Sequence, residues 1–219
     1  VPKFAGFPAG KNYRNTFRVK DGVLSIDYSD WPDFDGEFGH LVTSALFSRY
    51  ILRFEYRFLG EQVTDDASMS WAQRNNGVML HSQSVESMAL DQKFPVSIEA
   101  QLLGGLNNGP RPTANLCTPA TNVVLEGRVY RAHCTKSVSD TFHGDQWVKA
   151  EFEVLGSDRI RHFINGKLVF EYKQPQYDPY SEDSEHLGRT SGLIASGRIA
   201  FQAESHPTQF RNVELMVLD

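Results

Sequence analysis

Residues 198–218 have the sequence Arg-Ile-Ala-Phe-Gln-Ala-Glu-Ser-His-Pro-Thr-Gln-Phe-Arg-Asn-Val-Glu-Leu-Met-Val-Leu, and this stretch decides the fold class. Its first part alternates side chains with the two-residue period of a β-strand. Ser205-His206-Pro207 then predicts a connection to a second strand. The pattern predicts a strand that buries one face and presents a carboxamide and a carboxylate on the other. One face carries Ile199, Phe201 and Ala203, and the other carries Ala200, Gln202 and Glu204.

Strand-like alternation recurs along the chain, and helical periodicity is nearly absent. The strongest turn signal is Asn165-Gly166, which favours a tight type I′ hairpin, and Asp21-Gly22 marks a similar turn. Many short strands separated by turns predict an all-β fold, a two-sheet sandwich of the jelly-roll type. The predicted strands occupy 17–26, 50–58, 77–81, 96–103, 147–154, 159–163, 167–172, 198–204 and 208–218.

Length and charge narrow the class of protein. The 219 residues fit a single jelly-roll domain over 1–219, with insertions at about 104–139 and 174–192. A net charge of −5 gives no support to nucleic acid or an anionic membrane as a partner. No apolar run approaches the roughly 20 residues that span a bilayer. Val1-Pro2 is no natural translation start, which is consistent with a signal peptide that was removed or omitted.

Cys117 and Cys134 are the only cysteines, and they leave two alternatives open. A disulfide between them would stabilise the fold by about 3 kcal/mol in the chain-entropy model and would indicate an oxidising compartment. Two buried free thiols are the other alternative. Two cysteines alone do not complete a zinc site, and there is no Cys-x-x-Cys redox pair.

Four predicted strands carry polar side chains on one face and apolar side chains on the other. If these strands are neighbours in one sheet, their polar faces combine into a single surface. A bent sandwich makes such a face concave, and its amides and carboxylates suit the hydroxyls of a carbohydrate ligand. Exposed aromatic side chains could stack on sugar rings, and the candidates are Trp31, Trp71 and Tyr130. The polar residues are Arg53, Glu55 and Arg57; His81; Glu99 and Gln101; and Gln202 and Glu204.

An antiparallel sheet can also keep one face in water, where alternating charge is ordinary. Glu55, between Arg53 and Arg57, is explained most simply by cross-strand ion pairs. The pair Glu99 and Gln101 differs from this ion-pair pattern, because a glycine-rich loop follows it and its strand face carries few alternating lysines. Taken together, the four strands favour a carbohydrate site over a solvated face.

Five motifs in order resemble one known family. Residues 75–81, Asn-Asn-Gly-Val-Met-Leu-His, are similar to its Asn-Ser-Gly-Val-Phe-Leu-Arg strand. Residues 98–101, Ile-Glu-Ala-Gln, are similar to its Glu-x-Gln strand. Trp147, residues 162–166 and residues 202–212 follow in the family's order. Over about residues 14–218 the chain resembles the 3-keto-disaccharide hydrolase domain family.

The resemblance implies a concanavalin-like jelly roll, secreted or periplasmic, from environmental or gut bacteria. It also implies cleavage of glycosides that already carry a ketone at sugar carbon 3. That ketone acidifies the proton on carbon 2, and the leaving group on carbon 1 is beta to it. Such a site needs a base, an electrophile for the ketone oxygen and an acid for the leaving oxygen. A divalent metal would be one such electrophile.

The resemblance also supplies candidate site residues. Glu99 and Gln101 form the centre, with Glu99 as base or metal ligand and His81 as electrophile or ligand. His81 stands where the family has arginine, so a titratable or metal-binding group replaces a fixed cation. Glu204 completes the catalytic candidates. The substrate-binding candidates are Asn75, Gln202, Glu55, Arg57, Trp71 and Tyr130.

Laminarinase-like jelly rolls carry Glu-x-Asp-x-x-Glu on a concave strand, and spacing tests that alternative. Here Gln101 replaces the aspartate and Gly104 replaces the second glutamate. A retaining mechanism needs two carboxyl groups about 5–5.5 Å apart, which this strand alone does not supply, although Glu204 could come from another strand. We therefore expect an enzyme that cleaves 3-keto glycosides, and the alternative is a catalytically silent carbohydrate-binding module.

Overall fold

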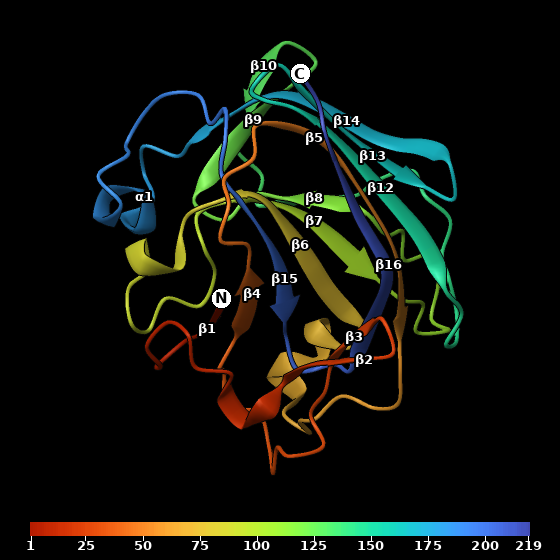
Figure 1. Ribbon diagram of the computed structural model, residues 1–219. Helices are drawn as coiled ribbons and strands as arrows, with labels where there is room; N and C mark the ends of the chain where they lie inside the picture. Colours follow the sequence, from red (N-terminus) through yellow and green to blue (C-terminus); the bar gives the residue numbers. More distant parts are fainter.

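Two antiparallel β-sheets face each other in the computed structural model, which describes all residues 1–219 (Figure 1). The seven-stranded sheet has the order β1 (Pro2–Phe4), β4 (Gly39–Val42), β15 (Arg198–Ala203), β6 (Asn75–Ser82), β7 (Ile98–Leu103), β8 (Asn115–Cys117) and β11 (Cys134–Thr135). The nine-stranded sheet has the order β10 (Arg128–Tyr130), β9 (Thr121–Leu125), β14 (Lys167–Tyr177), β13 (Arg159–Ile164), β12 (Val148–Leu155), β5 (Arg49–Phe58), β16 (Thr208–Val217), β3 (Val23–Ile26) and β2 (Phe17–Lys20). The predicted two-sheet jelly-roll sandwich is confirmed.

Helices are few and short. The chain has one α-helix, α1 (Glu182–His186), and three 3₁₀ helices, η1 (Tyr13–Asn15), η2 (Ala67–Ala72) and η3 (Val85–Ser87). None of them combines the length and the apolar character that crossing a bilayer would require.

Alternation of side chains builds the core between the sheets. In β5, every second residue from Tyr50 to Phe58 is buried, and these side chains join one core cluster of 32 residues drawn from both sheets. Both predicted tight hairpins form. Asp21 and Gly22 join β2 to β3, and Asn165 and Gly166 join β13 to β14, all four with the positive φ that a type I′ turn requires.

The two C-terminal strands do not pair with each other. β15 lies between β4 and β6 in the seven-stranded sheet, whereas β16 lies between β5 and β3 in the nine-stranded sheet (Figure 1). Ser205-His206-Pro207 is therefore a crossing from one sheet to the other. Because the chain leaves the seven-stranded sheet after Ala203, Glu204 and His206 lie at the end of a strand and next to the core.

The two predicted insertions contain regular structure. Residues 104–139 include β8, β9, β10 and β11, so this segment extends both sheets. Cys117 and Cys134 face each other on β8 and β11 and form a disulfide, which confirms the first of the two alternatives. Residues 174–192 begin inside β14 and include α1.

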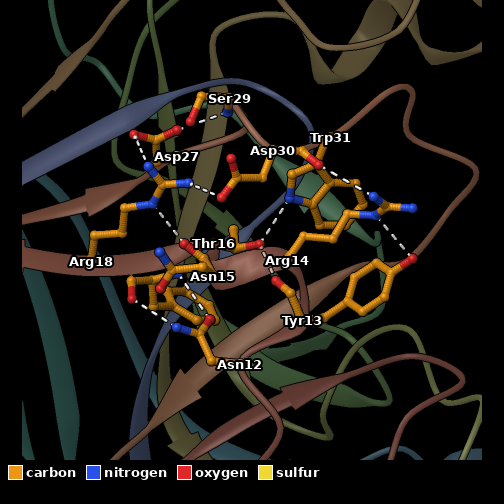
Figure 2. A network of polar contacts seen from close by, with 11 residues as sticks. Asn12, Tyr13, Arg14, Asn15, Thr16, Arg18, Asp27, Ser29, Asp30 and Trp31 are labelled. Atoms are coloured by element: carbon orange, nitrogen blue, oxygen red, sulfur yellow. Dashed lines mark hydrogen bonds and ion pairs between the residues drawn. The ribbon is translucent and has the colours of Figure 1, made fainter.

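A polar network around Trp31 joins residues 12–18 to residues 27–31 (Figure 2). The indole Nε1 of Trp31 donates to Thr16 Oγ1 at 2.9 Å, and Arg18 pairs with Asp27 and Asp30. Trp31 is only 6% exposed and stacks among core aromatic rings, so the expectation that it is an exposed sugar platform is wrong. Its ring instead closes one end of the core.

The disulfide gives a first prediction. Replacing Cys117 and Cys134 together with alanine should lower the free energy of unfolding by about 3 kcal/mol, because the unfolded chain regains the entropy of the closed loop. Urea unfolding of the variant and of the wild type measures this difference. Wild type in a reducing agent is the matched control and should behave like the variant. Equal stability of the oxidised and reduced wild type would contradict the prediction.

Candidate active site

The polar faces of β6, β7 and β15 meet on the side of the seven-stranded sheet that faces away from the core. Met79 pairs with Glu99, Gly77 pairs with Gln101, and Phe201 pairs with Val78. Alternate residues of these strands, such as Ile98 and Phe201, belong to the core cluster. Glu99 and Gln101, with Gln202 from β15, therefore share the opposite face, and Glu204 follows directly after β15. The structure thus brings together two of the four polar sets expected from the sequence, those of β7 and β15, on either side of β6.

Gly77 makes room for the Glu99 carboxyl group. A Cβ atom at position 77 would lie 2.3 Å from Oε1 of Glu99, closer than real Cβ contacts allow. The side chain of Glu99 thus lies across β6, in the space that a larger residue at position 77 would fill. This brings the carboxyl group from β7 toward β15, the strand that leads into Glu204.

Glu99 and Glu204 are buried, at 7% and 3% exposure, and each affects the ionisation of the other. Burial raises the pKa of Glu99 to about 8. Burial also raises the pKa of Glu204 well above its usual range, with a further contribution from the Glu99 charge. Two carboxyl groups that share a buried site do not ionise together easily, because like charges repel strongly there. At neutral pH both carboxyl groups therefore hold their protons.

A fixed positive charge lies next to this pair, on Arg111. Its Nη1 donates to the backbone carbonyls of Gln73 and Gly104, both at 2.7 Å. Its charge lowers the pKa of Glu204, against the stronger effect of burial. The sequence did not reveal Arg111, because it lies in the loop before β8 and carries no strand pattern.

His206 joins the same group from the sheet crossing. Burial, together with the charges of Arg74 and Arg111, lowers the pKa of His206 to about 3, so its imidazole is neutral. Its ring packs edge-on against Phe58 at a centroid distance of 5.6 Å. His206 therefore adds a neutral donor and acceptor at the end of β15.

Many buried polar atoms on this side of the sheet have no hydrogen-bond partner within the protein. Leaving one such group unpaired costs about 1–3 kcal/mol, so native proteins usually satisfy them with protein or water. Their concentration on neighbouring strands indicates a place built for a ligand or for ordered water. The atoms are Nδ1 and Nε2 of His40 and of His206, Oε1 and Nε2 of Gln202, Oδ1 of Asn75 and Oε2 of Glu204.

Gln101 contributes differently from the other amides. Its Oε1 accepts from Asn115 Nδ2 at 3.0 Å, and Asn115 in turn binds the backbone of Ser137. Gln101 is half-buried at the edge of the group. One of its polar atoms thus ties β7 to β8.

The structure does not bring His81 to this group. His81 has a φ of 51°, and the pairing of β15 with β6 shifts register beside it. Its Nε2 lies 3.0 Å from the Gly156 carbonyl of the opposite sheet, and its ring packs edge-on against Tyr50 in the core. The expectation that His81 shares a face with Glu99 is wrong, because the irregular backbone turns its ring toward the nine-stranded sheet.

The site therefore does not match the metal ligands suggested by the sequence. Glu99 and His81 point to opposite sides of the seven-stranded sheet. No group of three or more His, Cys, Asp or Glu side chains is arranged to hold a metal ion.

The other binding candidates lie elsewhere or at the margin. Glu55 and Arg57 are on β5, with side chains on the outer face of the nine-stranded sheet, so they do not reach Glu99. Glu55 instead pairs with Arg211 at 2.6 Å. Tyr130 is on β10, at the end of the same sheet. Trp71 is 47% exposed on η2, and its carbonyl accepts from Arg111 at 3.3 Å, which places it beside the Arg111 end of the site.

Comparison with known proteins gives one family and a shared fold. The profile of the 3-keto-alpha-glucoside-1,2-lyase-like domain matches residues 3–216. Two crystal structures of candidate glycosyl hydrolases from Parabacteroides distasonis have a similar fold. The first has 17% identity and a TM-score of 0.56, covering 95% of this chain and 93% of its own. The second has 19% identity and a TM-score of 0.54, covering 100% and 88%. No curated protein matches the sequence.

The raised pKa of Glu99 predicts how stability depends on pH. The folded protein holds this proton up to about pH 8, whereas the unfolded chain releases it near its ordinary value of 4.5. Glu99 therefore adds most to the free energy of unfolding at low pH, where both states hold the proton. This contribution is lost as pH rises through about 8. Glu99→Gln should make this slope shallower, leaving the contribution of Glu204, and should be the more stable protein at alkaline pH.

Urea unfolding between pH 5 and pH 9 tests this. Glu185→Gln, at an exposed carboxylate on α1, is the matched control and should keep the wild-type slope. A wild-type slope in Glu99→Gln would mean that the folded protein does not hold the proton on Glu99.

Proposed function

Because the chain belongs to the 3-keto-alpha-glucoside-1,2-lyase-like domain family, whose profile spans residues 3–216, we propose that it cleaves 3-keto glycosides by elimination followed by addition of water. The observation that carries the proposal is the buried carboxyl pair, Glu99 and Glu204, on strands that flank β6. When Glu99 ionises, at about pH 8, a protonated Glu204 beside it gives the site one carboxylate and one carboxylic acid. Elimination needs this combination of base and acid.

In the first half of the reaction, the carboxylate of Glu99 removes the proton from carbon 2. The electrons of that C–H bond form an enolate with negative charge on the ketone oxygen. When the ketone re-forms, the electrons make the double bond between carbons 1 and 2, and the bond from carbon 1 to the leaving oxygen breaks. The carboxylic acid of Glu204 gives its proton to that oxygen. The guanidinium of Arg111 stabilises the negative charge that develops on the ketone oxygen, as a preorganised cation does in a site with little water.

In the second half, water adds to the double bond. Glu204, now a carboxylate, takes a proton from the water, and the hydroxyl group bonds to carbon 1. Glu99 returns its proton to carbon 2. Both carboxyl groups regain their starting states, and the net reaction is hydrolysis of the glycosidic bond.

The neutral polar groups support binding rather than proton transfer. Gln202, Asn75 and His206 have free donors or acceptors and no charge that would compete with the carboxyl pair. Amides and neutral imidazoles suit sugar hydroxyls, which both donate and accept. The disulfide fits an oxidising compartment, which supports our expectation that the protein is exported.

The direct test is release of 4-nitrophenol from 4-nitrophenyl 3-keto-glucosides of both anomers. We expect turnover by the wild type and a loss of about 10²–10⁴-fold in Glu99→Gln, which cannot act as a base. The rate of the wild type should rise with pH through about 8 as Glu99 ionises, and the residual rate of Glu99→Gln should lack that rise. Initial rates from pH 5 to pH 10 measure both effects.

Glu185→Gln again serves as the control and should keep the wild-type pH profile. No release by the wild type, together with equal sugar binding by the wild type and Glu99→Gln, would overturn the enzymatic proposal in favour of a carbohydrate-binding module.

Gly77→Ala gives a test of geometry. The added Cβ would meet the Glu99 carboxyl, so Glu99 must move while both carboxyl groups remain. We expect about a 10²-fold loss of activity, because a shift of about 1 Å in a reacting group has effects of that size. The double variant Gly77→Ala, Glu99→Gln should be no less active than Glu99→Gln alone. Additive losses would show that Gly77 acts independently of Glu99.

A further inference from the structure

A second set of polar side chains continues the site across the seven-stranded sheet. Lys3 pairs with His40 across β1 and β4, and His40 pairs with Gln202 across β4 and β15. Their neighbours Phe4, Leu41 and Phe201 contact or belong to the core cluster, so Lys3, His40 and Gln202 share the face that carries Glu99. The row of Lys3, His40 and Gln202 thus ends beside Gly77, where the Glu99 carboxyl lies.

Four polar atoms at the centre of this row are enclosed and unpaired. Both ring nitrogens of His40 and both amide atoms of Gln202 lack a hydrogen-bond partner, and both side chains are 0% exposed. The two side chains are on adjacent strands and yet do not bond to each other. Such atoms need partners from outside the protein, since each unpaired one is unfavourable.

The row of Lys3, His40 and Gln202 offers neutral hydrogen-bonding groups and one ammonium N–H next to an apolar ring. Burial and the Lys3 charge lower the pKa of His40 to about 3, so its imidazole is neutral and offers one donor and one acceptor. The Lys3 ammonium donates to the carbonyls of Phe4 and Leu90, both at 2.9 Å, which leaves one N–H group. The ring of Phe94 packs edge-on near His40, at a centroid distance of 6.4 Å, and forms an apolar wall.

We propose that His40 and Gln202 form a subsite that hydrogen-bonds the hydroxyl groups on carbons 4 and 6 of a neutral sugar ring, on the side of the ring away from the bond that is cleaved. β15 lies between β4 and β6, so a ring that bonds both His40 and Gln202 extends along the row toward Gly77 and Glu99. Neutral donors and acceptors match hydroxyls, which do both, and do not attract an anionic sugar. This inference rests on the proposed function, because it places the reacting carbon at Glu99.

The test compares His40→Leu, which removes both ring nitrogens, with His40→Gln, which keeps a donor and an acceptor. The substrates are 4-nitrophenyl 3-keto-glucoside and its 4-deoxy and 6-deoxy forms. For the parent substrate, His40→Leu should lose about 10- to 100-fold in kcat/KM, mostly through KM, and His40→Gln should lose much less. With one of the two deoxy substrates, kcat/KM of the wild type should fall by a similar factor relative to the parent substrate. kcat/KM of His40→Leu should be the same for that deoxy substrate as for the parent substrate, because the hydrogen bond is already absent.

Two controls keep the result interpretable. His162→Leu alters another buried histidine, whose ring nitrogens are both satisfied by Ala114 and Tyr172, and it should lower Tm without changing the preference among substrates. Melting temperatures show whether each variant is folded. A folded His40→Leu that loses the same factor on all three substrates, or loses nothing, would overturn the subsite, and so would a folded His40→Gln that loses as much as His40→Leu.

The same comparison remains available if the wild type does not turn over these substrates. Methyl glucoside and its 4-deoxy and 6-deoxy forms are then titrated into the wild type and His40→Leu by calorimetry. If His40→Leu binds methyl glucoside more weakly than the wild type does, and the two proteins bind one deoxy sugar equally, the subsite is supported even though the proposed reaction is refuted. Equal affinities for all sugars in both proteins would refute the subsite itself.

Discussion

The carboxyl group of Glu99, held across Gly77 in a buried position, is the constraint on which the rest of the site depends. A charged carboxylate in this position would be costly, so burial raises its pKa to about 8. Stability alone would favour an apolar residue here, since neighbouring Met79 and Ala200 fill the same face. A protonated acid at the centre of a sheet face is instead a group that can exchange a proton at moderate pH.

The crossing between the sheets supplies the remaining parts of the site. β15 ends at Ala203, and the chain turns through Ser205 toward β16. Glu204 and His206 therefore extend beyond the ladder of the seven-stranded sheet, where no neighbouring strand occupies their polar atoms. Arg111 reaches the same place from the loop before β8, and backbone carbonyls fix its guanidinium. The jelly-roll topology thus gathers groups that are more than 90 residues apart in the chain.

The sequence predicts regular elements well and their spatial arrangement less well. Alternation locates strands such as β5 and β7, and Asn165-Gly166 locates a hairpin. It does not show which sheet a strand joins, so β5 with Glu55 and Arg57 was expected beside Glu99 and lies in the other sheet. It also fails at His81, because a positive φ at a histidine has no local signal and reverses the direction of the side chain. Short strands such as β1 and β4 are too brief to show a period, and for that reason Lys3 and His40 were not recognised.

Both outer faces of the sandwich carry alternating polar residues, and their hydrogen-bond partners distinguish them. On the nine-stranded sheet, arginines meet carboxylates directly, as in the pairs Arg211 with Glu55 and Arg161 with Glu153, both within 2.7 Å. On the seven-stranded sheet, buried amides and imidazoles have no partner in the protein. A solvated face would expose such groups to water, and a structural polar network would pair them. Groups that are both enclosed and unpaired fit neither case, and this contrast, rather than the polar pattern itself, supports our proposal that the seven-stranded sheet binds the ligand.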